Sequence, residues 1–203
     1  MHNSVFKVFL TCYLFICSGS TLYAQYQNSM GFVISYDAVK AFPLRKSSTA
    51  DIPNYYRSGF SLKIPLKIDM TEYIKLRTAL QYSKAGSNVY NKSYSVNYVR
   101  VPLDIRFDII QDWNCTLYCF AGPYAGYNIS SKATMINGRN IPISKLDFGG
   151  NAGGGVELPL NDSINISFEL SYLLGIKDIY TEQDYRILTN TNWSVGTGIH
   201  YIF

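Results

Sequence analysis

The chain has 203 residues, a length that fits one domain, and only 16% of them are charged, whereas 15% are aromatic. Its formal net charge of +4, without any run of lysine or arginine, argues against a nucleic-acid-binding protein. Tyrosine and glycine are abundant, with 18 and 15 residues, and this composition favours strands over helices.

The beginning of the chain has the layout of a secretory signal peptide. Lys7 precedes an apolar stretch from Val8 to Cys17, which is too short for a membrane-spanning helix, and small polar residues follow it. We expect cleavage after Ala24, with cleavage after Ser20 as the alternative. The predicted organisation is therefore a signal peptide over residues 1–24 and one domain over residues 25–203.

Eight segments of the remaining chain show, or approach, the alternation of apolar and polar residues that is typical of strands with one apolar face. In chain order they are residues 29–36, 57–68, 72–84, 94–109, 116–130, 146–158, 163–176 and 189–203. In the fourth segment, Tyr94, Val96 and Tyr98 are out of phase with the apolar residues that follow, which predicts a β-bulge near Tyr98. Pro65 and Pro102 lie inside predicted strands, where we expect bulges or ends of the register.

The gaps between these segments alternate in length. Residues 37–56, 69–71, 85–93, 110–115, 131–145, 159–162 and 177–188 give gaps of 20, 3, 9, 6, 15, 4 and 12 residues. Short turns at one end and longer loops at the other are characteristic of a transmembrane β-barrel. Independent loops would produce this order only occasionally.

Three features favour an apolar face that points outward to lipid. Five segments supply about two dozen large apolar residues on one face, more than an eight-stranded interior can hold. The opposite face is polar, charged or small. Aromatic residues bound the apolar face, as interfacial girdles do, and the predicted girdle consists of Phe60, Tyr82, Phe107, Trp193, Tyr201 and Phe203. The sequence therefore predicts an all-β fold, an eight-stranded antiparallel transmembrane β-barrel with up-and-down connections.

Charged residues on the polar face are expected to line the lumen. They are Lys63, Lys67, Lys75, Arg77, Arg100, Asp104, Arg106, Asp108, Asp147, Glu157 and Glu169. Unpaired charges would be costly in a narrow interior, so these six cations and five anions should form a paired network. Such a network would fill the lumen, and a gated ion path is the alternative.

No nucleotide-binding loop, metal-ligand spacing or nucleophile elbow is recognisable, and we expect no cofactor, no metal and no enzymatic activity. The glycines between residues 149 and 155 lack the strand-to-helix context of a phosphate site and are expected to let a strand curve. His200, the only histidine after the signal, is expected to hydrogen-bond inside the lumen rather than to act as a general base.

Four stretches of the chain carry a resemblance to a known family. They are NYVRVPLDIRFDI (97–109), YCFAGPYAGYNIS (118–130), LDFGGNAGGGVEL (146–158) and ISFELSYLLGI (166–176). These stretches resemble the outer-membrane β-barrel domain family that includes the PorT-like proteins. The resemblance extends from about residue 29 to the end. It implies a non-enzymatic barrel in the outer membrane of a Gram-negative bacterium, which acts in structure, surface interaction or secretion through its loops or rim. It also implies that Phe203 is the insertion signal read by the barrel insertion machinery.

An even number of strands would place both termini in the periplasm and the long loops outside the cell. The expected partners are outer-membrane lipid, lipopolysaccharide, the insertion machinery and a secretion-complex or surface partner, without nucleic acid. Basic residues of the loops would contact lipopolysaccharide phosphates or would simply be solvated. The alternative functions are a small porin or ion-conducting channel, a lipid-modifying outer-membrane enzyme and a soluble ligand-binding barrel.

Overall fold

The computed structural model describes residues 28–43, 54–55, 57–89, 92–112, 114–134, 143–177 and 188–203. The predicted signal peptide, residues 1–24, lies outside the described residues. The strands are β1 (Ser29–Pro43), β2 (Asn54–Tyr55), β3 (Arg57–Asp69), β4 (Ile74–Val89), β5 (Lys92–Asp112), β6 (Cys115–Thr134), β7 (Leu146–Asn161), β8 (Ile164–Gly175) and β9 (Leu188–Ile202). Among the described residues there is no helix long and apolar enough to cross a membrane.

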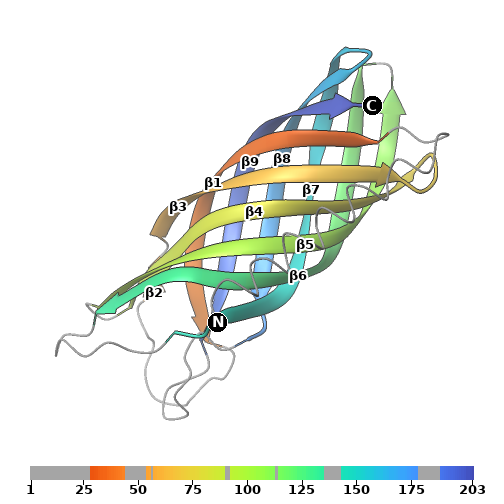
Figure 1. Cartoon of the computed structure of the whole chain (residues 1–203). Coiled ribbons are helices and arrows are strands. Elements are labelled where there is room, and N and C mark those ends of the chain that lie inside the picture. The colour runs from red at the N-terminus through yellow and green to blue at the C-terminus, as the bar shows by residue number, and fades with distance from the viewer. Residues whose placement is uncertain are drawn as a thin grey trace.

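The strands form one closed antiparallel barrel. Neighbours in the sheet follow the order β2, β4, β3, β1, β9, β8, β7, β6, β5, and pairing of β4 with β5 closes the ring. The two-residue strand β2 only extends the edge of β4 beyond β3. The eight long strands correspond to the eight predicted segments, and they wrap obliquely around a single cylinder (Figure 1). The predicted eight-stranded antiparallel barrel is confirmed.

The two faces of the strands differ as predicted for a barrel with an apolar outer surface. On β5, Arg100, Asp104 and Arg106 are buried, whereas Leu103 and Ile105 between them are 46% and 47% exposed. This pattern is the reverse of that in a soluble protein, where large apolar side chains are mostly inside. The apolar side chains therefore form the outer surface of the barrel, and the polar ones fill its interior.

The predicted loop at residues 85–93 is mostly strand. β4 and β5 stay paired as far as Val89 and Lys92, which leaves only residues 90–91 between them. The sequence predicts a loop here because the segment lacks large alternating apolar residues. Backbone hydrogen bonding between strands does not require apolar side chains. The β4–β5 hairpin therefore continues beyond the part of the barrel that has an apolar outer surface.

A register irregularity lies where the bulge is predicted, between Asn97 and Tyr98 in the ladder of β5 with β6, but the extra residue is not in β5. β5 keeps one register against β4 on both sides of Tyr98. Val96 and Tyr98 simply point into the barrel, where they are 0% and 2% exposed. The irregularity at this level belongs to β6, in which Ile129 is the extra residue opposite β5. The change of phase in the sequence therefore marks a part of the interior that accepts apolar and aromatic side chains.

The two prolines produce neither a bulge nor a register end. Pro65 pairs with Ala79 of β4, and the ladder of β3 with β1 is interrupted beside it without a change of register. Pro102 pairs with Tyr124 of β6, and the ladder of β5 with β4 has a similar gap. The hydroxyl of Thr78 donates to the carbonyl oxygen of Pro102 at 2.8 Å, which satisfies that oxygen. Each proline thus removes hydrogen bonds from one side of its strand only.

Candidate functional site in the barrel interior

The structure places all eleven predicted lumen residues inside the barrel, and each forms at least one ion pair. The nitrogen–oxygen distances range from 2.5 to 3.8 Å. Most of these side chains are almost completely buried; Lys75 is the most exposed, at 18%. Charges this deep attract strongly, but each would be costly if it lost its partner.

Glu157 on β7 connects opposite walls of the barrel near the end where β9 finishes. Its carboxylate accepts hydrogen bonds from Nζ of Lys67 on β3 at 2.6 and 2.8 Å. It also accepts two from the guanidinium of Arg106 on β5, at 2.7 and 3.1 Å. Arg106 in turn pairs with Asp108 at 2.5 Å. Because β3 and β7 are four strands apart in an eight-stranded ring, this cluster crosses the lumen.

Glu169 on β8 forms a second crossing, farther from that end. It accepts from Lys63 of β3 at 2.9 Å and pairs with Arg77 of β4 at 2.7 Å. Arg77 also lies 3.8 Å from Asp104, and the amide of Asn151 donates to Asp104 at 3.1 Å. The two clusters together link five strands through side chains in the interior.

A third cluster surrounds Arg100. Its guanidinium donates to Ser83 at 2.6 Å and pairs with Asp147 at 3.2 Å. The hydroxyl of Tyr124 donates to the same carboxylate at 3.2 Å. The ring of Tyr98 lies 4.5 Å from the guanidinium carbon. At this level aromatic side chains therefore share the interior with the charges.

Aromatic rings on β6 separate the arginines from the glycines of β7. The guanidinium of Arg77 lies 3.9 Å from the centre of the Phe120 ring, and that of Arg106 lies 3.7 Å from the Tyr118 ring. A β-carbon at Gly153 would lie 2.5 Å from the Phe120 ring. The sequence analysis explains these glycines by strand curvature. The contacts add a second reason, because glycines that face the interior leave room for the aromatic rings of β6. The sequence feature that indicates this packing is a set of alternating aromatic residues in one segment followed by alternating glycines in the next.

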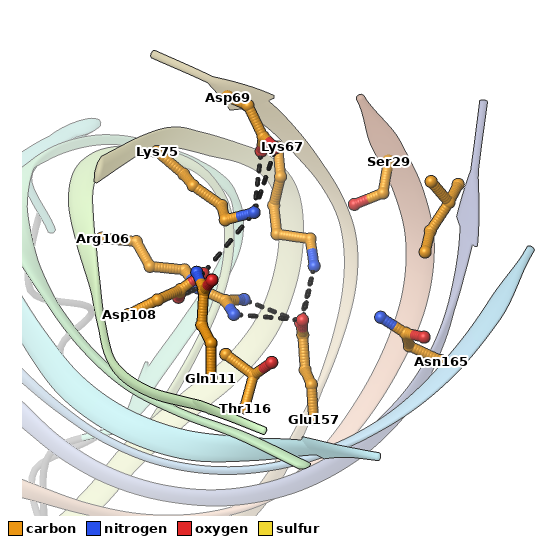
Figure 2. A pocket seen from close by; sticks show the side chains of 11 residues that line it. Ser29, Lys67, Asp69, Lys75, Arg106, Asp108, Gln111, Thr116, Glu157 and Asn165 are labelled. Carbon is orange, nitrogen blue, oxygen red and sulfur yellow. Dashed lines mark hydrogen bonds and ion pairs between the residues drawn. The ribbon is translucent and has the colours of Figure 1, made fainter. Parts of the chain in front are cut away.

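The interior opens into a cavity of about 260 Å³ at the end of the barrel where β1 begins and β9 finishes (Figure 2). Its lining includes ion-paired side chains, namely Lys67, Asp69, Lys75, Arg106, Asp108 and Glu157. The other lining residues are uncharged: Ser29, Gln111, Thr116, Asn165 and Ile202. The cavity is a polar vestibule that ends at the Glu157 cluster.

Three further polar residues lie in the interior beside the predicted charge network. His200, expected in the lumen, is buried, and its Nε2 lies 2.8 Å from the hydroxyl of Ser167. Asp69, which was not predicted, pairs with Lys75 at 3.0 Å. Asp37, which the sequence analysis also does not assign to the interior, is fully buried. In the described part of the chain no three side chains of His, Cys, Asp or Glu are grouped as metal ligands.

The predicted girdle residues lie on the outer surface. Five of them are half exposed, namely Phe60, Phe107, Trp193, Tyr201 and Phe203. The rings of Phe60 and Tyr82 are 6.3 Å apart, and those of Tyr201 and Phe203 stack at 6.4 Å. Strand β9 ends at Ile202, but Phe203 continues its pairing, because its N–H donates to the carbonyl of Asn28 at 2.9 Å. Phe107, Tyr201 and Phe203 are near one end of the barrel, and Phe60, Tyr82 and Trp193 are nearer the other.

Solved structures of bacterial barrels share this fold. Neisserial surface protein A (NspA) is 14% identical, with a TM-score of 0.53 over 83% of this chain and 95% of that one. OprG from Pseudomonas aeruginosa is 9% identical, with a TM-score of 0.58 over 88% and 96%. AlkL, determined in DMPC lipid bilayers, is 13% identical, with a TM-score of 0.51 over 89% and 92%. At these identities the likeness concerns the fold alone.

Sequence comparison identifies the family. No curated protein matches the chain significantly. A family model described as "Outer membrane protein beta-barrel domain" matches residues 19–181, which is well over half of the chain. The closed barrel with an apolar outer surface and a charged interior is the structure that this description requires. The chain therefore belongs to the outer membrane protein beta-barrel domain family.

Proposed function

We propose that this outer-membrane protein is a closed, non-enzymatic barrel that acts through its loops and rim, in structure, surface interaction or secretion. The observation that carries the proposal is the crossing of the interior at two levels by the ion pairs of Glu157 and Glu169. Each carboxylate binds cations from other walls of the barrel. A solute could pass only if these buried pairs separated.

The cost of separation supports a lumen that stays closed. Removing one partner of a buried ion pair typically costs about 3–5 kcal/mol, because the other charge remains without compensation. Opening the lumen would disturb both Glu157, with Lys67 and Arg106, and Glu169, with Lys63 and Arg77. An eight-stranded barrel also leaves little free width beyond its own side chains. Both arguments favour a scaffold over a porin.

The proposed orientation has Asn28 and Phe203 on the periplasmic side, and places outside the cell the three longer connections together with the two-residue connection of β4 to β5. Two- to four-residue turns join β3 to β4 and β7 to β8 at the end of the barrel that contains Asn28 and Phe203. Short periplasmic turns are the rule in barrels of this class. The half-exposed ring of Phe203, stacked on Tyr201, is then available as the proposed recognition element for the insertion machinery.

The opposite rim suits an anionic outer leaflet. Lys84, Lys145 and Lys177 are exposed there, and Nζ of Lys177 lies 5.7 Å from the ring of Phe148. Ammonium groups beside an interfacial aromatic ring can bind lipopolysaccharide phosphates at the depth of the headgroups. The finer proposal, a PorT-like role in protein secretion, is supported by the four family-like stretches, which form much of β5 to β8.

Planar-bilayer recording tests the closed lumen. The purified wild-type protein should give no discrete conductance steps, whereas a Glu157→Gln, Glu169→Gln double variant should give transient ones. Asp162→Asn, which changes an exposed turn acid, is the matched control and should behave as the wild type. Regular single-channel steps from the wild type would refute the proposal and would favour the small porin.

A further inference from the structure

Asp37 on β1 is an exception among the interior carboxylates. Each other acidic residue that lies inside the described part of the barrel has a lysine or arginine nitrogen within 4.0 Å. Asp37 is 0% exposed and has no such partner there. An ionised carboxylate buried without compensation is strongly unfavourable. Its negative charge therefore calls for a partner of another kind.

Two hydroxyls hydrogen-bond to one carboxylate oxygen of Asp37, and the other oxygen has no partner in the described part of the chain. The hydroxyls of Ser61 and Ser194 both donate to Oδ1, at 3.2 and 2.6 Å. The second oxygen, Oδ2, is buried, and no described residue hydrogen-bonds to it. This arrangement leaves Oδ2 open to a positive ligand.

One other buried oxygen that has no hydrogen-bond partner among the described residues lies beside Asp37. It is Oδ1 of Asn192, a residue that is 3% exposed. Asn192 is diagonal to Asp37 across the β1–β9 ladder, because Asp37 pairs with Ser194. Oγ of Ser35 also has no partner there, but it cannot bind the same ion as Asn192. Ser35 pairs with Gly196 and Asn192 pairs with Val39, so the two side chains are about 13 Å apart along the ladder. Two adjacent strands thus direct a carboxylate and an amide oxygen toward one region.

We propose that Asp37 and Asn192, supported by the hydroxyls of Ser61 and Ser194, bind a hard monovalent cation inside the barrel, for which Na⁺ is the probe. Carboxylate, carbonyl and hydroxyl oxygens are the donors that hard cations prefer. A single carboxylate balances one positive charge, which selects a monovalent ion over a divalent one. The bound cation takes the place of the ion pair that each other acid inside the described part of the barrel has. The proposal does not depend on the proposed function.

Unfolding in matched salts tests this site. The folded full-length mature barrel in an uncharged detergent is unfolded by heat in NaCl and in N-methyl-D-glucamine chloride of equal ionic strength. A ligand that binds only the folded state raises the folding equilibrium constant in proportion to its concentration once it exceeds Kd. The wild type should therefore unfold at a higher temperature in NaCl, and tenfold more Na⁺ above Kd should raise the constant about tenfold. Asp37→Asn should lose the difference, whereas Asp162→Asn, at an exposed turn, should keep it.

Two further measurements make the test independent of the folding of the Asp37 variant. Asn192→Ala removes one oxygen but keeps the carboxylate, so it should need a higher Na⁺ concentration for the same stabilisation. Broadening of the ²³Na resonance by the wild type should saturate, and K⁺ in excess should compete with it. Equal unfolding of the wild type in the two salts, with no ²³Na broadening, would overturn the proposal in favour of a protonated or hydrated Asp37. Retention of the Na⁺ effect by Asp37→Asn would also overturn it.

Discussion

Substitution Gly153→Ala tests the packing of the β6 rings against β7. A β-carbon at this position would lie 2.5 Å from Cζ of Phe120 and 2.4 Å from the carbonyl oxygen of Leu170. Both distances are far below van der Waals contact, and the carbonyl oxygen belongs to the backbone, so it cannot move away by a change of rotamer. Overpacking of this kind costs about 1–3 kcal/mol. We expect the free energy of unfolding to fall by that amount.

Gly150 provides the matched control in the same strand. It points to the outer surface, and a β-carbon there would meet no atom within 4 Å. Alanine reduces the conformational freedom of the unfolded chain relative to glycine, which stabilises a protein by about 0.4–1 kcal/mol where the folded backbone accepts it. Gly150→Ala should therefore be neutral or slightly stabilising, and the free energies of unfolding of the two alanine variants should differ by about 1–4 kcal/mol.

The assay is equilibrium unfolding by urea in phospholipid vesicles, followed by tryptophan fluorescence. Trp193 is half exposed on the outer surface, so its emission should report the loss of the lipid environment. A second substitution, Phe120→Leu, should recover part of the stability lost in Gly153→Ala, because it removes the contact with the aromatic ring and leaves the two contacts with the β8 backbone. Equal stability of Gly153→Ala and Gly150→Ala, or strict additivity with Phe120→Leu, would refute the packing argument.

Three other predictions concern the lumen, the strand end and the chemistry. Glu157→Gln should lower the free energy of unfolding by about 3–5 kcal/mol, because Lys67 and Arg106 lose their shared charge partner. Urea unfolding measures this loss, with Asp162→Asn as the control variant. Equal urea midpoints for the two variants would contradict the prediction. Phe203→Ala should reduce the heat-modifiable, folded fraction in outer-membrane preparations without changing total synthesis, and an unchanged fraction would exclude the proposed insertion role. Mass spectrometry of lipid A from cells that overexpress the wild type should show no new species, whereas a deacylated or acylated product would indicate an enzyme.

The alternation of the sequence determined where the strands lie and which face of each is apolar. Leu103 and Ile105 are exposed on the outer surface, and Asp104 between them is buried in the interior. This order requires a strand, because successive side chains of a strand point to opposite faces. The eleven charged residues could be assigned to the interior for the same reason. The phase change at Tyr98 predicts the level of a β-bulge but not the strand that carries the extra residue, which is Ile129 of β6. Sequence periodicity cannot distinguish a bulge in the same strand from an aromatic side chain placed inside a barrel.

The partners inside the lumen depended on the tertiary structure. Glu157 is 90 residues from Lys67 and 51 from Arg106 along the chain, and closure of the ring brings all three together. Whether a charge meets an opposite charge across the lumen depends on the stagger of all eight strands, which no local pattern contains. The same stagger placed Asp37 beside serines instead of a cation and put Phe120 over Gly153. Local alternation therefore specifies the sides of each strand, whereas contacts across the interior arise only when the barrel closes.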